Sequence, residues 1–171
     1  MGAGQGMIRA RVALALGLLA LAAPVAAQEA IYGDFGVALG QPFDGRMAQG
    51  TVRLSGTTEA VRFQPSYPLY LFRDYFVVVT PRTGLVAGIV ARSVDFSSMP
   101  ECVNHLNSVQ GFLGRYGLPQ LVAQTDREVM VQIEQGNRAV YLRCNRGDHI
   151  RMELNYADYQ MLQLRAQEGG K

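Results

Sequence analysis

The strongest periodic pattern in the chain predicts a helix over about residues 99–116. Ser98 and Glu101 have the spacing of a capping box before its first turn, and Gly117 followed by Pro119 is typical of a helix end. Between these signals apolar side chains recur on one side of the predicted helix, and they are Cys102, Leu106, Val109, Leu113 and Tyr116, with Phe112 beside them. We therefore expect an amphipathic helix whose apolar side lies against a sheet.

Segments rich in β-branched and aromatic residues predict the strands of that sheet. The expected strands are 51–54, 61–63, 75–80, 85–93, 128–134, 139–144 and 149–156. Turn sequences separate several of them, for example Pro-Arg-Thr-Gly at 81–84 and Gly-Asn at 136–137. Residues 31–43 have a weaker β-like pattern. The aromatic segment 65–72 contains two prolines, so we expect it at an edge or in a loop.

Alternation is clearest in the last strand. One side of this strand is apolar and consists of Ile150, Met152 and Leu154. The other side is polar and consists of Arg151, Glu153 and Asn155. A short helix is expected over 158–167. These elements together predict an α+β fold, in which an antiparallel sheet of five or more strands carries the long capped helix on one face and a short helix ends the chain.

The first 27 residues have the pattern of a bacterial secretory signal peptide. Arg9 and Arg11 precede an apolar run from Val12 to Ala23, and Val25-Ala26-Ala27 supplies the small residues of a cleavage site. We predict cleavage after Ala27, which leaves residues 28–171 as a single domain. The alternative is a membrane anchor, but Pro24 ends the apolar run well before the roughly 20 residues that span a bilayer.

This segment predicts a periplasmic or secreted protein. No cysteine lies near the cleavage site, so a lipoprotein anchor is not expected, and the mature protein should contain no transmembrane segment. The formal net charge of +2 comes from Arg9 and Arg11, so the rest of the chain is formally neutral. A neutral chain gives no electrostatic reason to expect nucleic acid as a partner.

Cys102 and Cys144 are the two cysteines of the chain, and they are too far apart in sequence for a C-x-x-C redox motif. An even number of cysteines in an oxidising compartment predicts a structural disulfide. The alternative is two buried free thiols. A bridge would close a long loop and stabilise the fold by roughly 4 kcal/mol in the chain-entropy account.

Candidate catalytic or metal-ligating residues form no convincing set. Glu101 and His105 lie one helical turn apart, but the capping box already explains Glu101, and two ligands do not make a metal site. Asp148 and His149 are adjacent, and neighbours on a strand point to opposite faces. No serine lies in a nucleophile elbow. We therefore expect no metal and no cofactor, and we identify no catalytic residue.

Two surfaces are better candidates for binding. The first is the side of the predicted helix away from its apolar stripe. Its residues are small and uncharged except for Arg115, so they would permit close approach by another backbone. The second is the aromatic segment before the first long strand. The candidate residues are Asn104, Asn107, Ser108, Gly111, Gly114 and Arg115 on the helix, and Tyr67, Tyr70 and Phe72 in the aromatic segment.

The sequence thus favours an exported envelope protein without enzymatic activity that binds another envelope protein or a small ligand. The alternative hypothesis is a small periplasmic hydrolase whose active site these patterns do not reveal. A pocket of convergent polar side chains around a desolvated ionisable group would favour the enzyme. A flat apolar surface patch would favour the binding protein.

Overall fold

The computed structural model describes residues 28–54 and 58–169. The predicted signal peptide and its cleavage point after Ala27 lie outside the described residues. Within the described ranges, no helix is both long enough and apolar enough to cross a membrane.

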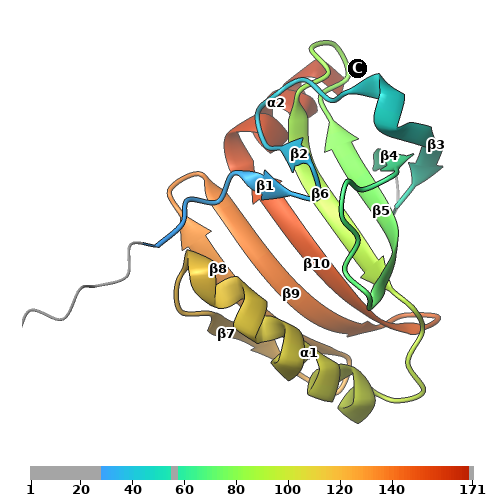
Figure 1. Cartoon of the computed structure of the whole chain (residues 1–171), viewed down its shortest axis with the longest axis vertical. Coiled ribbons are helices and arrows are strands. Elements are labelled where there is room, and N and C mark those ends of the chain that lie inside the picture. The colour runs from blue at the N-terminus through green and yellow to red at the C-terminus, as the bar shows by residue number, and fades with distance from the viewer. Residues whose placement is uncertain (1–27, 55–57, 170–171) are drawn as a thin grey trace, which may run out of the picture.

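An antiparallel sheet of eight strands forms the centre of the fold (Figure 1). The strands follow the order β3-β4-β5-β6-β10-β9-β8-β7. Their bounds are β3 (Ala48–Arg53), β4 (Glu59–Phe63), β5 (Phe72–Val79), β6 (Val86–Ser93), β7 (Gln120–Gln124), β8 (Glu128–Gln135), β9 (Arg138–Arg146) and β10 (Ile150–Asp158). The expected α+β class, with a sheet of five or more strands, is confirmed.

β7 is the strand that the sequence pattern did not predict. Four of its five residues pair with β8 in a hairpin, and Val122 has no partner because the register shifts between Leu121 and Ala123. Four of the five, Gln120, Leu121, Val122 and Gln124, are exposed. Such a short segment has little strand preference of its own, so its conformation depends on the neighbouring β8 rather than on a local pattern.

The predicted long helix is present as α1 (Met99–Leu113), followed by a 3₁₀ turn at Gly114–Tyr116. The side chain of Ser98 accepts a hydrogen bond of 3.3 Å from the backbone N–H of Glu101, as the capping box predicted. The carboxylate of Glu101 in turn accepts hydrogen bonds from the backbone N–H and the hydroxyl of Ser97. These bonds satisfy groups that a helix start would otherwise leave unpaired.

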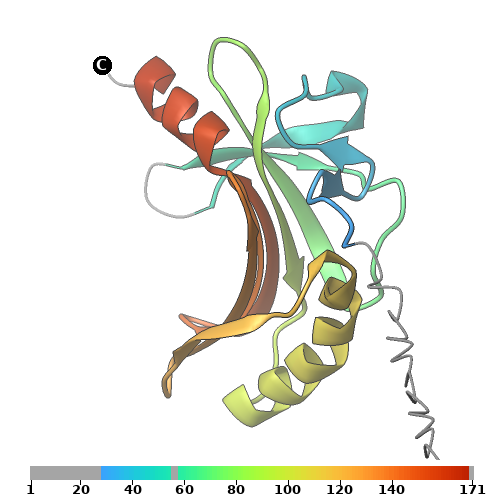
Figure 2. The same ribbon diagram turned by 90° about the vertical axis from the view of Figure 1, so that its left-hand side faces the viewer.

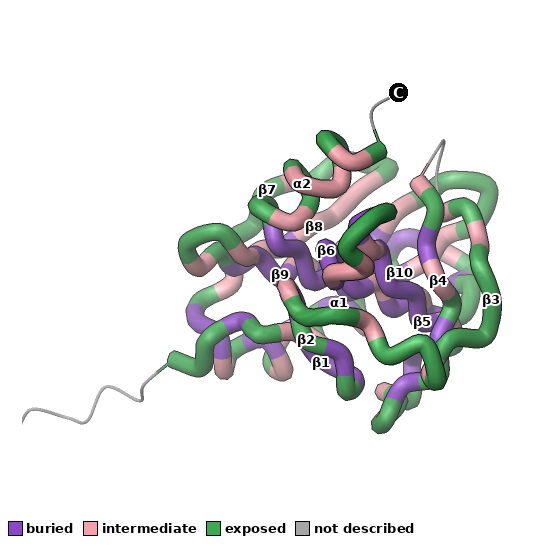
Figure 3. Tube along the Cα trace, turned by 90° about the horizontal axis from the view of Figure 1, so that it is seen from above, coloured by how far each residue is buried: buried purple, intermediate pink, exposed green. Residues whose placement is uncertain are grey.

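α1 and a small N-terminal hairpin cover one face of the sheet, and α2 (Tyr159–Gly169) lies at one end of the other face (Figure 2). The main core lies under α1, where Leu106 packs with Leu142 and Leu154. Figure 3 shows that buried residues are concentrated in the central strands, whereas β3 at the sheet edge is largely exposed. The middle of the second face therefore has no helix over it.

The N-terminal hairpin consists of β1 (Gly33–Asp34) and β2 (Val37–Ala38). Phe35 in its turn has a φ of 60°, which is unusual for a residue with a side chain. Its ring is fully buried and meets the ring of Tyr75 edge-on, with 4.9 Å between the ring centres. Burial of this ring offsets the cost of the backbone conformation.

The predicted pair of cysteines is joined in the structure. Cys102 in the first turns of α1 and Cys144 in β9 have Cα atoms 6.0 Å apart and form a disulfide. Both residues are fully buried. The bridge therefore ties α1 to the sheet at the point where the apolar side of the helix meets β9.

Candidate binding site

The uncovered face of the sheet is the most distinctive polar surface of the described chain. We call it the open face, and its central residues are Phe76, Val90, Arg92, Met130, Gln132, Tyr141, Arg143, Glu153 and Asn155. Figure 2 shows that the strands bend so that this face is concave, with α2 at its upper end. Met161 of α2 packs against Phe76 and Val78 there. The remaining part of the face is lined mainly by side chains that can form hydrogen bonds.

A row of ion pairs crosses the open face through three neighbouring strands. The register places Arg143 of β9, Glu153 of β10 and Arg92 of β6 side by side. One oxygen of Glu153 accepts a bond of 2.7 Å from Arg92, and the other accepts bonds of 2.6 and 2.9 Å from Arg143. Both carboxylate oxygens are therefore occupied, in a side chain that is largely buried.

The two arginines keep Glu153 ionised. Burial alone would raise the pKa of this carboxyl, but the guanidinium groups of Arg143 and Arg92 hold its pKa below the ordinary value. A carboxylate with a lowered pKa and both oxygens engaged is poorly suited to general acid or base catalysis at neutral pH. Glu153 instead holds the two arginines in fixed positions.

Asn155 lies two residues after Glu153 on β10, so its side chain is on the same face of the sheet and forms the next row of the open face. The register places it between Val90 of β6 and Tyr141 of β9. Asn155 is 4% exposed, and its amide nitrogen has no hydrogen-bond partner among the described residues. A buried amide donor without a partner costs about 1–3 kcal/mol, so sequences seldom retain one without a use for it.

Tyr141 stands beside Asn155 and supplies a second polar group. Burial raises the pKa of its hydroxyl, so the group stays protonated at physiological pH. On its other side the register places Gln132, whose amide donates to Glu134 and to the hydroxyl of Tyr159 in α2. The centre of the open face thus combines an amide, a phenol and two fixed guanidinium groups.

At the end of this face near the β9–β10 turn lies a hollow of about 390 Å³. Its lining is Leu54, Arg92, Asn145, Gly147, Asp148, His149, Arg151 and Glu153. His149 Nδ1 lies 2.8 Å from Asp95 Oδ2, and Arg151 binds the other oxygen of Asp95. The adjacent Asp148 is not the partner of His149. Both residues lie in the turn before β10, whereas the sequence pattern placed His149 at the start of the last strand. The sequence did not indicate Asp95, because it lies in a separate segment after β6.

Nucleophilic catalysis finds little support in this hollow. Its lining contains no serine, threonine or cysteine. The hydrogen bond from Arg151 lowers the pKa of Asp95, so this carboxylate is ionised when it orients His149. His149 and Asp95 are both about half exposed, which leaves them in contact with water. The pair corresponds to the acid and the histidine of a catalytic triad, without the nucleophile.

Comparison with family models, with curated proteins and with solved structures found no match to this chain.

The helix surface predicted from the sequence is exposed in part. Asn104, Asn107, Ser108, Gly111 and Gly114 are exposed on the outer side of α1. A Cβ atom built at Gly111 or Gly114 would meet nothing within 4 Å. Asn107, Gly111 and Gly114 line a shallow hollow of about 550 Å³ with Leu118. This side of α1 is therefore open to close approach, and no charged side chain of the described residues lines its hollow.

Arg115 does not belong to that exposed surface. Its guanidinium donates a hydrogen bond of 2.7 Å to the carboxylate of Asp34, whose side chain is 1% exposed. The same carboxylate accepts bonds from the hydroxyls of Tyr67 and Tyr156, at 2.5 and 2.6 Å. Burial and the negative charge of Asp34 raise the pKa of Tyr156 far above its ordinary value, so this hydroxyl remains a donor. We call Asp34, Tyr67, Arg115 and Tyr156 the anchor cluster.

The aromatic candidates are divided by the fold. Phe72 is 3% exposed and packs in the main core, so it cannot contribute to a surface. Tyr67 exposes part of its ring but uses its hydroxyl in the anchor cluster. Tyr70 is exposed in the loop before β5. The prediction that Phe72 belongs to a surface is therefore wrong, because β5 already begins at Phe72 and turns its side chain into the core.

The helix residues considered as metal ligands have other partners. Glu101 binds Ser97 at the start of α1. The ring of His105 lies 5.2 Å from the ring of Phe96.

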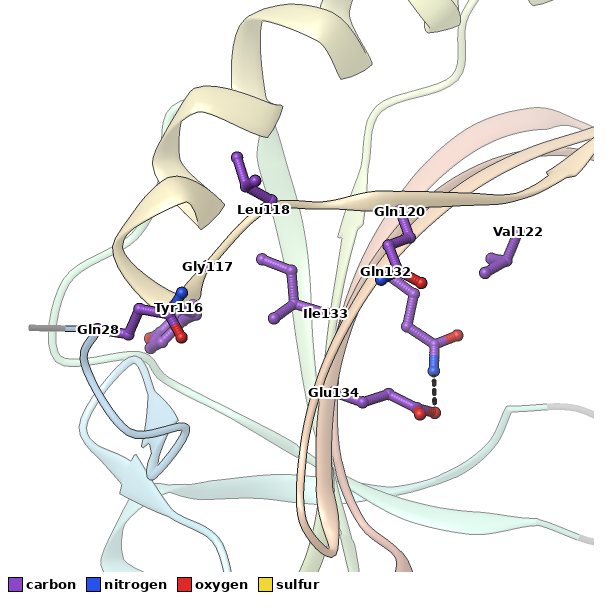
Figure 4. A pocket seen from close by; sticks show the side chains of 9 residues that line it. All are labelled: Gln28, Tyr116, Gly117, Leu118, Gln120, Val122, Gln132, Ile133 and Glu134. Atoms are coloured by element: carbon purple, nitrogen blue, oxygen red, sulfur yellow. Dashed lines mark hydrogen bonds between the residues drawn. The ribbon is translucent and has the colours of Figure 1, made fainter. Parts of the chain in front are cut away.

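A further hollow of about 520 Å³ lies beside β8, near the edge of the sheet (Figure 4). Its walls come from β8 and from the segment that leads from the end of α1 into β7. Gln132 and Glu134 of β8 lie on one side, joined by a hydrogen bond, and Gly117 and Leu118 lie on the other. β7 pairs with residues 129–132 of β8 but not with 133–135, and the hollow occupies the place where the hairpin stops.

Proposed function

We propose that this protein is an exported binding module without enzymatic activity, and that its open face binds a small, neutral, polar ligand. Export rests on the pattern of the first 27 residues and agrees with the buried disulfide. The observation that carries the choice of site is the buried amide nitrogen of Asn155, which lacks a partner among the described residues. A ligand carbonyl or hydroxyl oxygen would supply the acceptor that this amide needs.

The charges of the open face favour a neutral ligand. Arg92 and Arg143 share Glu153, Arg143 also lies 3.7 Å from Glu128, and Arg62 pairs with Asp74 at the adjoining edge. These groups balance one another, so the centre of the open face carries no net charge that would attract an anion or a cation. Glu134, whose described partners are Gln132 and Tyr159, lies towards α2 and outside this centre. The ring of Tyr141 adds apolar contact between the polar groups, whereas the ring of Phe76 is buried under Arg62 and Arg92. Such a mixture is typical of sites for polar small molecules.

A periplasmic hydrolase remains the second candidate, and the observation that favours it is the pair of His149 and Asp95 beside a hollow. Water would then have to be the nucleophile, because the hollow lining offers no hydroxyl or thiol side chain. The two hypotheses predict different sensitive residues. Binding depends on Asn155, whereas hydrolysis depends on His149.

Replacement of Asn155 with leucine tests the proposal. Leucine has a similar volume and removes the unpaired donor, so Asn155→Leu should stabilise the free protein by about 1–3 kcal/mol and abolish binding. Asn107→Leu on the exposed side of α1 is the matched control, and it should change neither property.

The binding measurement titrates a panel of free sugars, amino-acid amides and short uncharged peptides into each protein. Binding is detected by the NMR signals of the Asn155 side-chain amide in the wild type and by the backbone amide signals of β9 and β10 in both proteins. At least one panel member should shift these signals in the wild type. The proposal is wrong if no compound shifts them, or if Asn155→Leu binds as well as the wild type. Ester or amide hydrolysis that is lost in His149→Ala and kept in Asn155→Leu would establish the alternative.

A further inference from the structure

β7 forms one edge of the eight-stranded sheet (Figure 1). It pairs with β8 on one side only, so its other side presents backbone N–H and C=O groups that no strand of the described chain pairs with. An open edge of this kind is a template for pairing with another strand.

The residues of β7 carry none of the charges that usually protect such an edge. The strand reads Gln120-Leu-Val-Ala-Gln124 and contains no lysine, arginine, acidic residue or proline. Leu121 is 57% exposed, Val122 is 49% exposed, and Leu118 just before the strand is 88% exposed. The bulge at Val122 twists the strand but adds no charge.

The opposite edge of the sheet is different. β3 (Ala48–Arg53) ends at a charged residue and contains Gly50, and it exposes no large apolar side chain. An ion pair between Asp44 and Arg46 lies directly before it. The β3 edge is therefore protected by charge and the β7 edge is not, although each has one side that pairs with no strand of the described chain.

The sequence of β7 is complementary to itself. In an antiparallel pairing of two copies centred on Val122, Gln120 of one copy lies opposite Gln124 of the other, and Leu121 lies opposite Ala123. No like charges meet, and the amide side chains of the outer pairs can form hydrogen bonds with each other. In the flanks, Asp126 of the turn would lie opposite the uncharged Leu118 of the second copy.

From these features we infer that β7 is the pairing surface for a second copy of this chain. Two copies related by a twofold axis through Val122 form one continuous antiparallel sheet across the dimer. A twofold axis makes the contact isologous, so it closes at two copies and does not propagate into fibres. The open faces of both copies remain uncovered, because the contact involves only the sheet edge.

Sedimentation of the full chain, expressed with its own N-terminal segment, tests the dimer. At about 1 mM protein, even a dimer with a Kd of about 1 mM holds half of the chains. We expect dimer in the wild type and at least a tenfold weaker association in Val122→Lys. Val94→Lys is the matched control, because Val94 is also a half-exposed valine but lies in the loop after β6. It should associate like the wild type.

Cysteine variants test the register. Residues directly opposite in an antiparallel pair have Cα atoms about 4.5–5.5 Å apart, within the range of a disulfide. Val122→Cys should therefore form a covalent dimer on mild oxidation. Gln124→Cys should not, because its two copies would lie about 14 Å apart along the strands. A mixture of Gln120→Cys and Gln124→Cys chains should cross-link again.

The natural disulfide does not interfere, because Cys102 and Cys144 are fully buried. A protein that stays monomeric at about 1 mM overturns the inference. So does a dimer that Val122→Lys leaves intact, or one that Gln124→Cys cross-links as readily as Val122→Cys. A complex with a different protein through β7, without self-association, would also overturn it and would identify β7 as a site for another strand.

Discussion

The hydroxyl of Tyr156 donates a hydrogen bond of 2.6 Å to the carboxylate of Asp34, which lies 122 residues earlier in the chain. Tyr67 and Arg115 bind the same carboxylate from two further segments. The anchor cluster thus joins the N-terminal hairpin, the 3₁₀ turn after α1, the loop before β5 and the second half of β10. Few single side chains in the described protein connect so many elements.

Loss of the Asp34 carboxylate should therefore be costly. In Asp34→Ala, the guanidinium of Arg115 and two tyrosine hydroxyls lose their acceptor, and we expect the free energy of unfolding to fall by about 3 kcal/mol. Urea unfolding measures this change. Asp44→Ala is the control, because Asp44 pairs with Arg46 on the surface and should contribute little. Equal effects of the two substitutions would contradict the role of the anchor cluster.

The disulfide should contribute a large part of the stability. Removal of both sulfurs in the double variant Cys102→Ala with Cys144→Ala opens a bridge between residues 42 apart, so we expect a loss of about 4 kcal/mol. Thermal unfolding under oxidising and reducing conditions measures the effect. The wild type should approach the double variant only when it is reduced. Free thiols in denatured, non-reduced wild type would show that the bridge is absent in solution.

The row of Arg92, Glu153 and Arg143 predicts a dependence of stability on pH. The pKa of Glu153 is lowered in the folded protein from an ordinary value of 4.5. The stabilisation is therefore fully present above this value and is lost as the pH falls through the lower, folded-state pKa. Glu153→Gln should be less stable than the wild type at about pH 7, and the difference should shrink below about pH 4.5.

Urea unfolding of both proteins from about pH 7 to about pH 3 measures this difference. Glu59→Gln is the control, because Glu59 is an exposed residue at the start of β4, and its unfolding curve should follow the wild type. If the free energy of unfolding of Glu153→Gln stays below that of the wild type by the same amount at acidic pH, Glu153 is not ionised in the folded state.

The glycines at the end of α1 should respond to alanine in opposite ways. Gly114 has a φ of −56° and free space around it, so Gly114→Ala should stabilise the fold by about 0.4–1 kcal/mol. Gly117 has a φ of 141°, and a Cβ there would lie 3.3 Å from the side chain of Gln28. Gly117→Ala should therefore lower the thermal midpoint. A stabilising effect at both positions would mean that the turn after α1 adopts another conformation in solution.

The local patterns of the sequence were sufficient for most elements. The helical spacing of apolar residues, with Ser98 before it, predicted α1 and placed Cys102 on its buried side. Strict alternation predicted β10 and separated Leu154 from Glu153 and Asn155 on opposite faces. These features depend only on the periods of helix and strand and on caps and turns, which neighbouring residues determine.

The tertiary structure decided which strands are neighbours, and with them the candidate sites. β6 lies beside β10 although α1 and three strands separate them in sequence, and only this pairing brings Arg92 to Glu153. Nothing in the sequence distinguishes Asp34 and Asp95 from the other acidic residues. Only the fold brings Asp34 to Tyr156 and Asp95 to His149. Partners across strands depend on strand order and register, which arise from burial of the whole sheet. The sequence by itself therefore determined the elements and their buried sides, and the packing of the complete chain determined which polar groups meet.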